Sequence, residues 1–385
     1  MTIPARIAEF ADEMTAIRRD IHEHPELGFE EVRTSGIVAE KLREWGVEVT
    51  TGVGKTGVVG VIKGNRPGRR IGLRADMDAL PIHEQTNLPY ASKNPGVMHA
   101  CGHDAHTTML LGAARYLAES RDFAGEAVVI FQPAEEGLGG ARAMIADGLF
   151  ERFPMDEVYG LHNSPFDEPG HVGVKPGAAM AGANFFDIRI TGKGGHAARP
   201  EASVDALMIA AGLVRDMQTI VSRNISPNDP IVLSVTRMQA GNAYNVIPET
   251  AELAGTVRYF SRDAAEQVSE RMRALCAGTA TAYGAEIDID IRNVFDVLEN
   301  SPAHSDAMLE TAAGLTAADK VRKKDEAVMG SEDFADMLQV VPGAYCTVGH
   351  AGDVPLHNPA YVFDDEALPL GAAIMARMVE TRGEA

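Results

Sequence analysis

The first part of the chain alternates between the two spacings of hydrophobic residues that strands and helices require. Residues 106–119 show the helical spacing most clearly, because apolar residues from Leu110 to Leu117 recur on one face. We expect a further, amphipathic helix at the start of the chain. Short apolar runs predict buried strands near residues 57–62, 70–75, 127–132 and 157–161. Strands and helices in alternation predict an α/β domain with a mostly parallel sheet that helices cover.

The pattern changes at about residue 180. Phe186, Ile188 and Ile190 alternate with polar residues, which is the period of a strand, and residues 204–214 then keep helical spacing. A strand, a strand, a helix and a strand follow at residues 231–238, 252–260, 263–281 and 285–295. The order β-α-β-β-α-β is typical of a ferredoxin-like unit of roughly 110 residues. A unit of that size is expected to be an insertion in a larger domain.

After about residue 295 the chain returns to mixed α/β character. A helix capped by Ser331 is expected there, followed by a strand at residues 344–349. A chain of 385 residues also exceeds what one hydrophobic core usually supports. We therefore predict a discontinuous first domain, residues 1–179 and 294–385, with residues 180–293 inserted as a second domain.

Composition and charge exclude several kinds of partner. The formal net charge is -20 at pH 7, so nucleic acids and anionic membranes would be repelled. No run approaches the roughly 18 apolar residues of a membrane span, and the start of the chain lacks the features of a secretory signal. The 3 cysteines are too few and too scattered for a disulfide framework. We expect a cytoplasmic protein, in which a local cationic pocket can still bind an anionic substrate.

One glycine-rich motif resembles a nucleotide-binding fingerprint but lacks its context. Residues 52–57, GVGKTG, match G-x-G-x-x-G, a motif that must follow a strand and open a helix. Here the strand pattern VVGVIKG follows instead. The motif therefore indicates a glycine-rich turn.

Residue types that bind metals gather in the loop before the 106–119 helix. Cys101 and His103 stand there within MHACGHD, residues 98–104. A thiolate and imidazoles are soft and borderline donors that suit zinc, manganese, nickel or cobalt. Taken alone, such a loop more often holds histidines that only form hydrogen bonds.

Three more places lie near the ends of expected strands or in loops, and ligands bind at strand ends in open α/β sheets. Glu135 and Glu136 follow one apolar run, His162 follows another, and His357 lies in the loop PLHNP. In extended chain the two glutamates would point in opposite directions, so one can bind metal while the other reaches a water molecule. Residues of these types at any one of these places, taken alone, more often have a structural role than bind metal. Together with the cysteine loop they supply enough ligands for two metal ions if one group bridges them.

An acidic segment, RADMDALP at residues 74–81, lies at the end of a further expected strand. An aspartate here, Asp76 or Asp78, can orient a ligating imidazole by accepting its N–H. The alternative is an ordinary acidic turn.

Nearly the whole chain resembles the zinc-peptidase superfamily of aminoacylases and glutamate carboxypeptidases. Within it, the chain is similar to the amidohydrolase branch of hippurate hydrolases, N-acyl-amino-acid amidohydrolases and auxin-conjugate hydrolases. The similarity rests on ordered motifs, namely RRDIHEHPELGFEE at 18–31, RADMDALPI at 74–82, MHACGHDAHTTMLLGAA at 98–114, FQPAEEG at 131–137, GLHNSP at 160–165, GKGGHAARP at 192–200, NVIP at 245–248, GSEDF at 330–334 and PLHNP at 355–359.

The resemblance implies a catalytic, metal-binding first domain with two divalent ions per subunit, zinc, manganese, nickel or cobalt. The implied ligands are Cys101, His103, Glu136, His162 and His357. Glu135 is the implied general base, and Asp78 matches a carboxylate beside the metals. Asp76 stands where related peptidases often carry a ligating histidine, so this branch is expected to have moved its ligands to the cysteine loop.

The resemblance also implies that the inserted domain is a lid and a dimerisation domain. His196 would help to stabilise the oxyanion, and Asn245 and Arg258 would meet the substrate carboxylate. In related enzymes this domain pairs between subunits, so the histidine can arrive from the partner chain. We expect a homodimer, with a homotetramer as the alternative.

The implied function is hydrolysis of the amide bond of N-acyl-amino acids, such as hippurate or N-acetyl-amino acids. Glu135 would take a proton from a water molecule whose pKa the metals lower, and return it to the leaving amine. One alternative is a dipeptidase or carboxypeptidase with the same metal chemistry. Another is a non-catalytic protein that binds metal or ligand on this fold, although such a protein usually lacks the base, and Glu135 is present.

Overall fold

The computed structural model describes residues 3–384 and contains two compact units. The larger unit comprises the chain up to Ala179, Leu298–Ala327 and the chain from Asp333 onward. The smaller unit comprises Met180–Val297 and Val328–Glu332.

The larger unit is built on a sheet that has eight strands within the described residues, in the order β1-β2-β4-β3-β5-β16-β6-β15. The pairs β4–β3, β3–β5, β5–β16 and β6–β15 are parallel, and the remaining pairs are antiparallel. The strands are β1 (Glu48–Val53), β2 (Gly57–Lys63), β3 (Arg66–Asp76), β4 (Ala124–Gln132), β5 (Glu157–Ser164), β6 (Val172–Val174), β15 (Val321–Lys323) and β16 (Gly343–Gly349), with a separate ladder of β7 (Gly177–Met180) and β14 (Leu298–Asn300). The prediction of an α/β fold with a mostly parallel sheet is confirmed.

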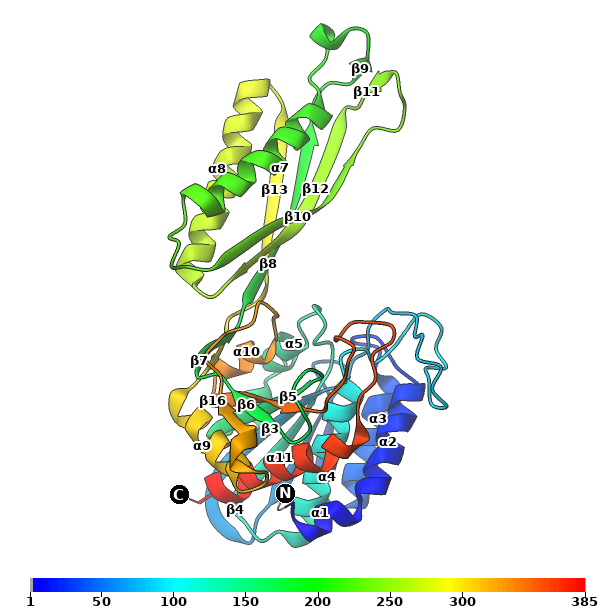
Figure 1. Ribbon diagram of the computed structural model, residues 1–385, viewed down its shortest axis with the longest axis vertical. Coiled ribbons are helices and arrows are strands. Elements are labelled where there is room, and N and C mark those ends of the chain that lie inside the picture. The colour runs from blue at the N-terminus through cyan, green and yellow to red at the C-terminus, as the bar shows by residue number, and fades with distance from the viewer. Residues whose placement is uncertain (1–2, 385) are drawn as a thin grey trace. The chain divides into compact units, whose positions relative to one another are not determined.

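Helices pack along this sheet, and Figure 1 shows α2, α3, α4 and α11 side by side. The helices are α1 (Ala5–Glu9), α2 (Ala11–Glu23), α3 (Val32–Glu44), α4 (His103–Ser120), α5 (Gly140–Ala146), α6 (Leu149–Arg152), α9 (Pro302–Ala313), α10 (Phe334–Leu338) and α11 (Leu368–Arg382). Among the helices of both units that the structure describes, none is long and apolar enough to cross a membrane.

α4 is the central helix of the larger unit. The apolar residues from Leu110 to Leu117 that predicted it are buried, and the helix packs against α2, α11 and β3. The predicted helix is confirmed, although it begins earlier, at His103. Because the helix is held by core packing along most of its length, the candidate ligand at its first residue has a fixed position.

The parallel strands β4, β3, β5 and β16 are neighbours, so their carboxyl ends meet at one edge of the sheet. Asp76, the last residue of β3, is paired with Gln132, the last residue of β4. His162 in β5 is paired with Thr347 in β16. Ligands of open α/β sheets bind at such an edge, and most of the candidate residues of the larger unit follow these strand ends.

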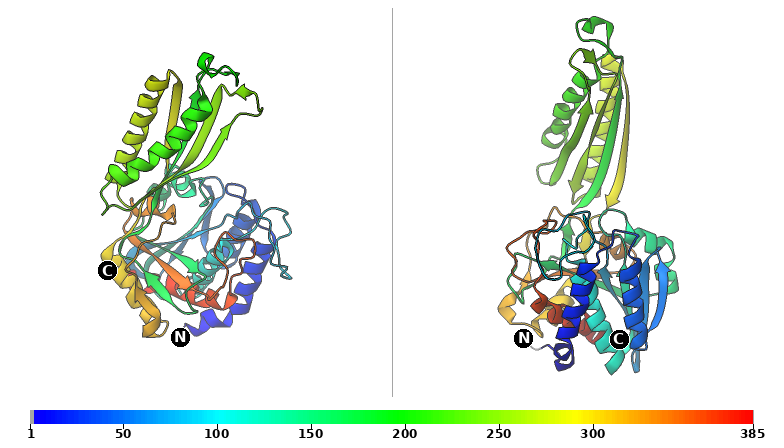
Figure 2. Two further views of the ribbon diagram at one scale, coloured as in Figure 1. Left: turned by 45° about the horizontal axis from the view of Figure 1, so that its top comes forward. Right: turned by 90° about the vertical axis from the view of Figure 1, so that its right-hand side faces the viewer.

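The smaller unit has the predicted order β-α-β-β-α-β. Phe186, Ile188 and Ile190 of its first strand are buried, because both helices cover that face of the sheet, as Figure 2 shows. The strand order within the described residues is β10-β12-β8-β13, with every pair antiparallel. The elements are β8 (Gly182–Thr191), α7 (Ala206–Arg223), β10 (Ile231–Ala240), β12 (Thr250–Tyr259), α8 (Arg262–Tyr283) and β13 (Glu286–Phe295), with a short ladder of β9 (Gly195–His196) and β11 (Val246–Ile247).

The expectation that Ser331 caps a helix is wrong. α10 begins at Phe334, and its N-cap residue is Asp333. The Ser331 hydroxyl instead donates to the Ala181 carbonyl at 2.7 Å and accepts from the Arg258 guanidinium. The hydroxyl that a helix cap would use is therefore bound to Ala181 and Arg258, two residues of the smaller unit that lie far from Ser331 in the sequence.

Candidate metal centre and active site

The turn before α4 carries the candidate ligands Cys101 and His103. Gly102, between them, has φ +90° and is the N-cap residue of the helix. Glycine adopts this left-handed conformation without the steric cost that other residues incur. A side-chain carbon at Gly102 would also lie 2.4 Å from Asn163 Nδ2. Both constraints require glycine, so the sequence C-G-H fixes the relative positions of the two ligands.

His103 directs one ring nitrogen into the site. Its Nδ1 lies 2.9 Å from the Asp78 carbonyl oxygen and 3.2 Å from Asp78 Oδ1, so Nδ1 carries a proton and donates it. Nε2 is buried and makes no hydrogen bond to any residue from 3 to 384. Although burial lowers the pKa of His103, the charges of Asp76 and Cys101 raise this pKa well above its usual value. The surroundings of Nε2 therefore favour a positive group, which is either a proton or a metal ion.

Cys101, His103 and His162 form a first candidate group, with ligand atoms that all lie within 4.8 Å of one another. His162 Nδ1 donates to the Asn163 carbonyl at 2.7 Å, and its Nε2 lies 3.4 Å from Cys101 Sγ. Burial and the neighbouring His106 lower the pKa of His162 to about 3. The ring is therefore neutral near pH 7, which is the form that binds metal.

Cys101, Glu136 and His357 form a second candidate group, again within 4.8 Å. Glu136 Oε1 lies 3.3 Å from His357 Nε2. Cys101 and Glu136 raise the pKa of His357 to about 10, so this group also favours a positive charge. His357 has φ +62°, a strained conformation for a residue with a side chain, and its N–H donates to the Ala100 carbonyl at 2.8 Å. The His357 side chain is 53% exposed, which leaves the second group open toward solvent.

The two groups share the Cys101 sulfur, so the five candidate ligands would be enough to hold two ions. Burial and the Glu136 charge raise the pKa of the Cys101 thiol, so its thiolate needs a nearby cation. His103 Nε2 is buried and lacks a hydrogen-bond partner among residues 3–384, and the buried Glu136 Oε1 has the ion-pair contact with His357 described above. Sulfur, nitrogen and carboxylate donors in this arrangement, with a buried ring nitrogen left unpartnered, fit divalent zinc, manganese, nickel or cobalt.

Glu135 and Glu136 lie in a turn, so the expectation of an extended pair is wrong. Ala134, just before them, has φ +52°, which turns the chain soon after β4. The carboxylates still have different surroundings. Glu136 joins the second group, whereas Glu135 is buried and its Oε1 accepts from the Asp333 N–H at 3.4 Å. A Glu135 oxygen nevertheless lies within 4.8 Å of ligand atoms of Glu136 and His103.

Asp78 connects the two candidate groups. Its Oδ1 accepts from His103 Nδ1 at 3.2 Å, and its Oδ2 accepts from the Glu136 N–H at 2.9 Å. A carboxylate that holds two ligands in this way orients them and increases the basicity of the imidazole. Asp78 is therefore placed to orient ligands, as expected for one of the two aspartates.

Asp76 lies deeper, in a buried network that the sequence did not reveal. Its Oδ1 is 2.7 Å from His106 Nδ1, and its Oδ2 is 2.7 Å from an Arg74 guanidinium nitrogen. Burial raises the pKa of Asp76, but His103 and Arg74 outweigh it and hold this pKa well below its usual value. Arg74 also donates to Asp333 Oδ1 at 3.0 Å. The network thus extends from α4 to the segment that contacts Glu135.

His196, Asn245 and Arg258 belong to the smaller unit. His196 is exposed in β9, and its Nδ1 accepts from the Ala198 N–H at 3.0 Å. The Asn245 carbonyl accepts from the Ala197 N–H at 3.0 Å, so Asn245 and His196 lie close together. Arg258 lies in β12, bound to the Ser331 hydroxyl.

Comparisons with known proteins extend over nearly the whole chain. The family model described as peptidase family M20/M25/M40 matches residues 72–381. The chain is 44% identical over 378 residues to a hippurate hydrolase of Campylobacter jejuni, with 98% of both chains covered. It is 39% identical to thermostable carboxypeptidase 1 of Saccharolobus solfataricus, over 95% of this chain and 94% of that protein. The crystal structure of a dinuclear-metal-binding peptidase of the M20 family from Bacillus subtilis matches with a TM-score of 0.84 and 37% identity, over 97% of this chain and 98% of that one.

Proposed function

Because the chain belongs to the peptidase family M20/M25/M40, we propose that it is a metal-dependent amidohydrolase that cleaves N-acyl-amino acids. It is a hydrolase of amide bonds, as its relatives are. An N-acyl-amino acid as substrate fits the similarity to a hippurate hydrolase, and this similarity exceeds that to the carboxypeptidase.

The arrangement around Cys101 carries this proposal. Two groups of three candidate ligands share its sulfur, and the buried carboxylate of Glu135 lies within 4.8 Å of one member of each, His103 and Glu136, but not in either group with Cys101. We propose two divalent ions per subunit, held by the five residues of the two groups. A carboxylate beside the ligands but outside them is suited to proton transfer.

When bound, the ions supply Lewis acidity toward the acyl carbonyl and lower the pKa of water. Glu135 takes the proton of the attacking water and later gives it to the leaving amide nitrogen, so the amide becomes a carboxylate and an amine. Asp78 keeps His103 and Glu136 oriented during this exchange, through its bonds at 3.2 and 2.9 Å.

The smaller unit is proposed to bind the other end of the substrate. The Arg258 guanidinium and the Asn245 amide are suited to a carboxylate, and the His196 imidazole to the oxygen that gains charge. Burial lowers the pKa of Arg258, and a substrate carboxylate would offset this effect. The exposure of His196 leaves its ring accessible to a ligand.

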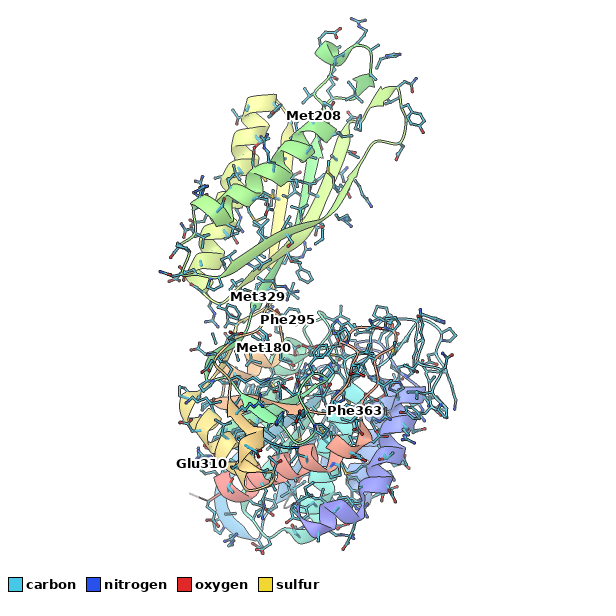
Figure 3. All side chains as sticks on the ribbon, viewed as in Figure 1. Met180, Met208, Phe295, Glu310, Met329 and Phe363 are labelled. Atoms are coloured by element: carbon cyan, nitrogen blue, oxygen red, sulfur yellow. The ribbon has the colours of Figure 1, made fainter. Side chains whose placement is uncertain are left out.

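We also propose a homodimer, formed through the smaller unit. Met208 of α7, which Figure 3 labels, is 61% exposed, and Leu207 beside it is 38% exposed. Val232 and Met238 of β10, a strand at the edge of the four-stranded sheet, are also exposed. An exposed strand edge with nearby apolar side chains favours pairing with a second copy. A cytoplasmic location is proposed as well, because the proposed ligand Cys101 must stay reduced and cytosolic thiols are kept reduced.

The alternative is a carboxypeptidase or dipeptidase, which the similarity to thermostable carboxypeptidase 1 favours. A purely metal-binding protein would not need a buried Glu135 beside the two groups. Hydrolysis of benzoyl- and acetyl-amino acids should be compared with that of dipeptides on zinc- and manganese-loaded protein of measured metal content. We expect faster turnover of the N-acyl-amino acids. Preference for dipeptides would favour the alternative, and no turnover of either class by metal-loaded protein would contradict an enzyme.

Subunit mixing tests the role of His196 and the dimer together. His196→Ala is expected to lower kcat by about a hundredfold or more, the effect of losing one oxyanion donor, with metal content intact. If the histidine acts on the partner's site, mixed dimers of His196→Ala and Glu135→Gln should regain partial activity. Without rescue in demonstrably mixed dimers, the histidine acts within its own chain. Near-normal kcat for His196→Ala would remove it from the reaction.

A further inference from the structure

Asn163 of β5 is buried, at 2% exposure, and its side chain is hydrogen-bonded at both ends. Its Nδ2 donates to the Cys101 carbonyl at 2.6 Å and lies 3.0 Å from His106 Nε2. Its Oδ1 lies 2.7 Å from the Tyr361 hydroxyl and 3.2 Å from His350 Nε2. One amide therefore joins the turn before α4, α4 itself and two positions beyond β16.

The surroundings of His106 determine how the Asn163 amide is oriented. The backbone N–H of Asn163 can only donate, and it lies 3.0 Å from His106 Nε2. Nε2 is therefore an acceptor, and the ring proton is on Nδ1, which donates to Asp76 Oδ1 at 2.7 Å. Since Nε2 accepts, Asn163 must present its NH2 group on this side. The same NH2 group then faces the Cys101 carbonyl.

We propose that Asn163 is a positioning residue for the metal centre and sets the distance between Cys101 and His162. The inference rests on the proposed metal site. The Asn163 backbone carbonyl accepts from His162 Nδ1 at 2.7 Å, while its side chain holds the Cys101 carbonyl. Two of the three ligands of the first group, Cys101 and His162, thus form hydrogen bonds with one residue. Metal–ligand distances vary by only about 0.2 Å, so a small shift of the turn weakens metal binding.

The close fit around Asn163 supports this role. A side-chain carbon at Gly102 would lie 2.4 Å from Asn163 Nδ2 and 3.1 Å from the Tyr361 hydroxyl, so the turn passes directly against both groups. His350, a partner of Oδ1, packs on the ring of Phe363 with centroids 4.8 Å apart, and Figure 3 labels Phe363 in the larger unit. The partners of Asn163 are therefore held in place by packing, and the turn cannot move without breaking these bonds.

Asn300 provides a matched control elsewhere in the larger unit. It is 1% exposed, and its Nδ2 donates to the carbonyls of Lys175 and Tyr345 at 2.9 and 3.1 Å. Its Oδ1 accepts from the Tyr345 N–H at 2.8 Å. Asn300 is thus a buried amide hydrogen-bonded at both ends, as Asn163 is, but neither Lys175 nor Tyr345 is a proposed ligand.

The test compares Asn163→Asp with Asn300→Asp. Both changes keep the shape of the side chain and place a carboxylate oxygen against a backbone carbonyl. Zn²⁺ affinity is measured by competition with a chromophoric chelator, and the melting temperature is measured on the metal-free proteins. We expect both variants to lose stability without metal. Asn163→Asp should weaken Zn²⁺ binding by about 10–100-fold, whereas Asn300→Asp should stay within about twofold of wild type, as for independent sites.

Zn²⁺ affinity of Asn163→Asp within about twofold of wild type would overturn the proposal, and so would equal weakening by Asn300→Asp. If Asn163→Asp does not fold, Tyr361→Phe replaces it, because it removes only the hydroxyl that holds Asn163 Oδ1. It should weaken Zn²⁺ binding by about two- to tenfold, the effect of one hydrogen bond. Unchanged affinity there would overturn the proposal. Failure of the wild type to bind Zn²⁺ would instead contradict the proposed function.

Discussion

Replacing Asp78 by asparagine tests whether this residue orients the ligands. The carboxylate accepts from His103 Nδ1 at 3.2 Å and from the Glu136 N–H at 2.9 Å. An amide keeps one acceptor, so its NH2 group must face one of these donors. The His103 ring can still donate to the backbone carbonyl of residue 78, which lies 2.9 Å away. The amide oxygen should therefore stay on Glu136, and the side-chain bond to His103 is lost.

The size of the effect follows from that single lost bond. A hydrogen bond to a charged group contributes about 1.5–3 kcal/mol, which corresponds to about 10–100-fold in Kd. Asp78→Asn should weaken Zn²⁺ binding by this factor, measured by chelator competition, and keep kcat within about tenfold of wild type at saturating metal. Asp205→Asn is the matched control, because the Asp205 carboxylate also accepts two hydrogen bonds, both of them from backbone N–H groups at the start of α7.

Unchanged Zn²⁺ affinity in Asp78→Asn would refute the orienting role. A loss of kcat beyond about a thousandfold at saturating metal would show that Asp78 takes part in the chemistry itself, since losing one orienting partner typically costs about 10–100-fold.

Three further outcomes are expected. Chelators should abolish activity and divalent metal should restore it. Oxidation of Cys101 should inactivate the enzyme by expelling metal. Full activity in metal-free protein would refute the dependence on metal. Burial lowers the pKa of His22, but Asp104 outweighs burial and raises this pKa to about 9. Protonated His22 therefore stabilises the fold fully below its unfolded pKa of about 6.5, and this stabilisation is lost as the pH rises through 9. Between pH 6 and 10 the unfolding free energy of the metal-free wild type should fall by up to about 3 kcal/mol more than that of His22→Gln. Unfolding free energies are obtained from urea titrations at each pH, and an equal change with pH in the two proteins would contradict this prediction. Arg258→Gln should raise KM for N-acyl-amino acids by about 10–100-fold. KM should stay near wild type for the corresponding N-acyl-amino-acid amides, which lack the carboxylate. A KM that is unchanged for both kinds of substrate would exclude a contact between Arg258 and the carboxylate.

Hydrophobic spacing was enough to predict the main elements. The apolar face of residues 106–119 and the alternation of Phe186, Ile188 and Ile190 describe elements whose buried face is set by local sequence. Ser331 shows where this approach fails. Its neighbourhood has the residue types of a helix cap, but the hydroxyl binds Ala181, 150 positions away in the sequence. Spacing along the chain carries no information about such a partner.

The candidate ligands could be proposed from motifs because metal-binding residue types cluster in the sequence. The hydrogen-bond network of His106, Asp76 and Asn163 could not be predicted in this way. His106 lies three residues after His103 on α4 and faces inward with it, which is a signal that helical spacing offers. The partners of His106, however, are Asp76 and Asn163, 30 and 57 positions away. The fold brings these residues together, and their pairing becomes visible only when the strand ends are assembled.

Glu135→Gln tests the proposed reaction most directly, with Glu136→Gln beside it. Glutamine keeps the shape of Glu135 but cannot accept the proton, so kcat for an N-acyl-amino acid should fall by about 10²–10⁴-fold while metal content stays at the wild-type level. The adjacent Glu136→Gln should instead lose metal, because its carboxylate is a proposed ligand. A metal-loaded Glu135→Gln enzyme that keeps more than about a tenth of the wild-type kcat would contradict Glu135 as the general base.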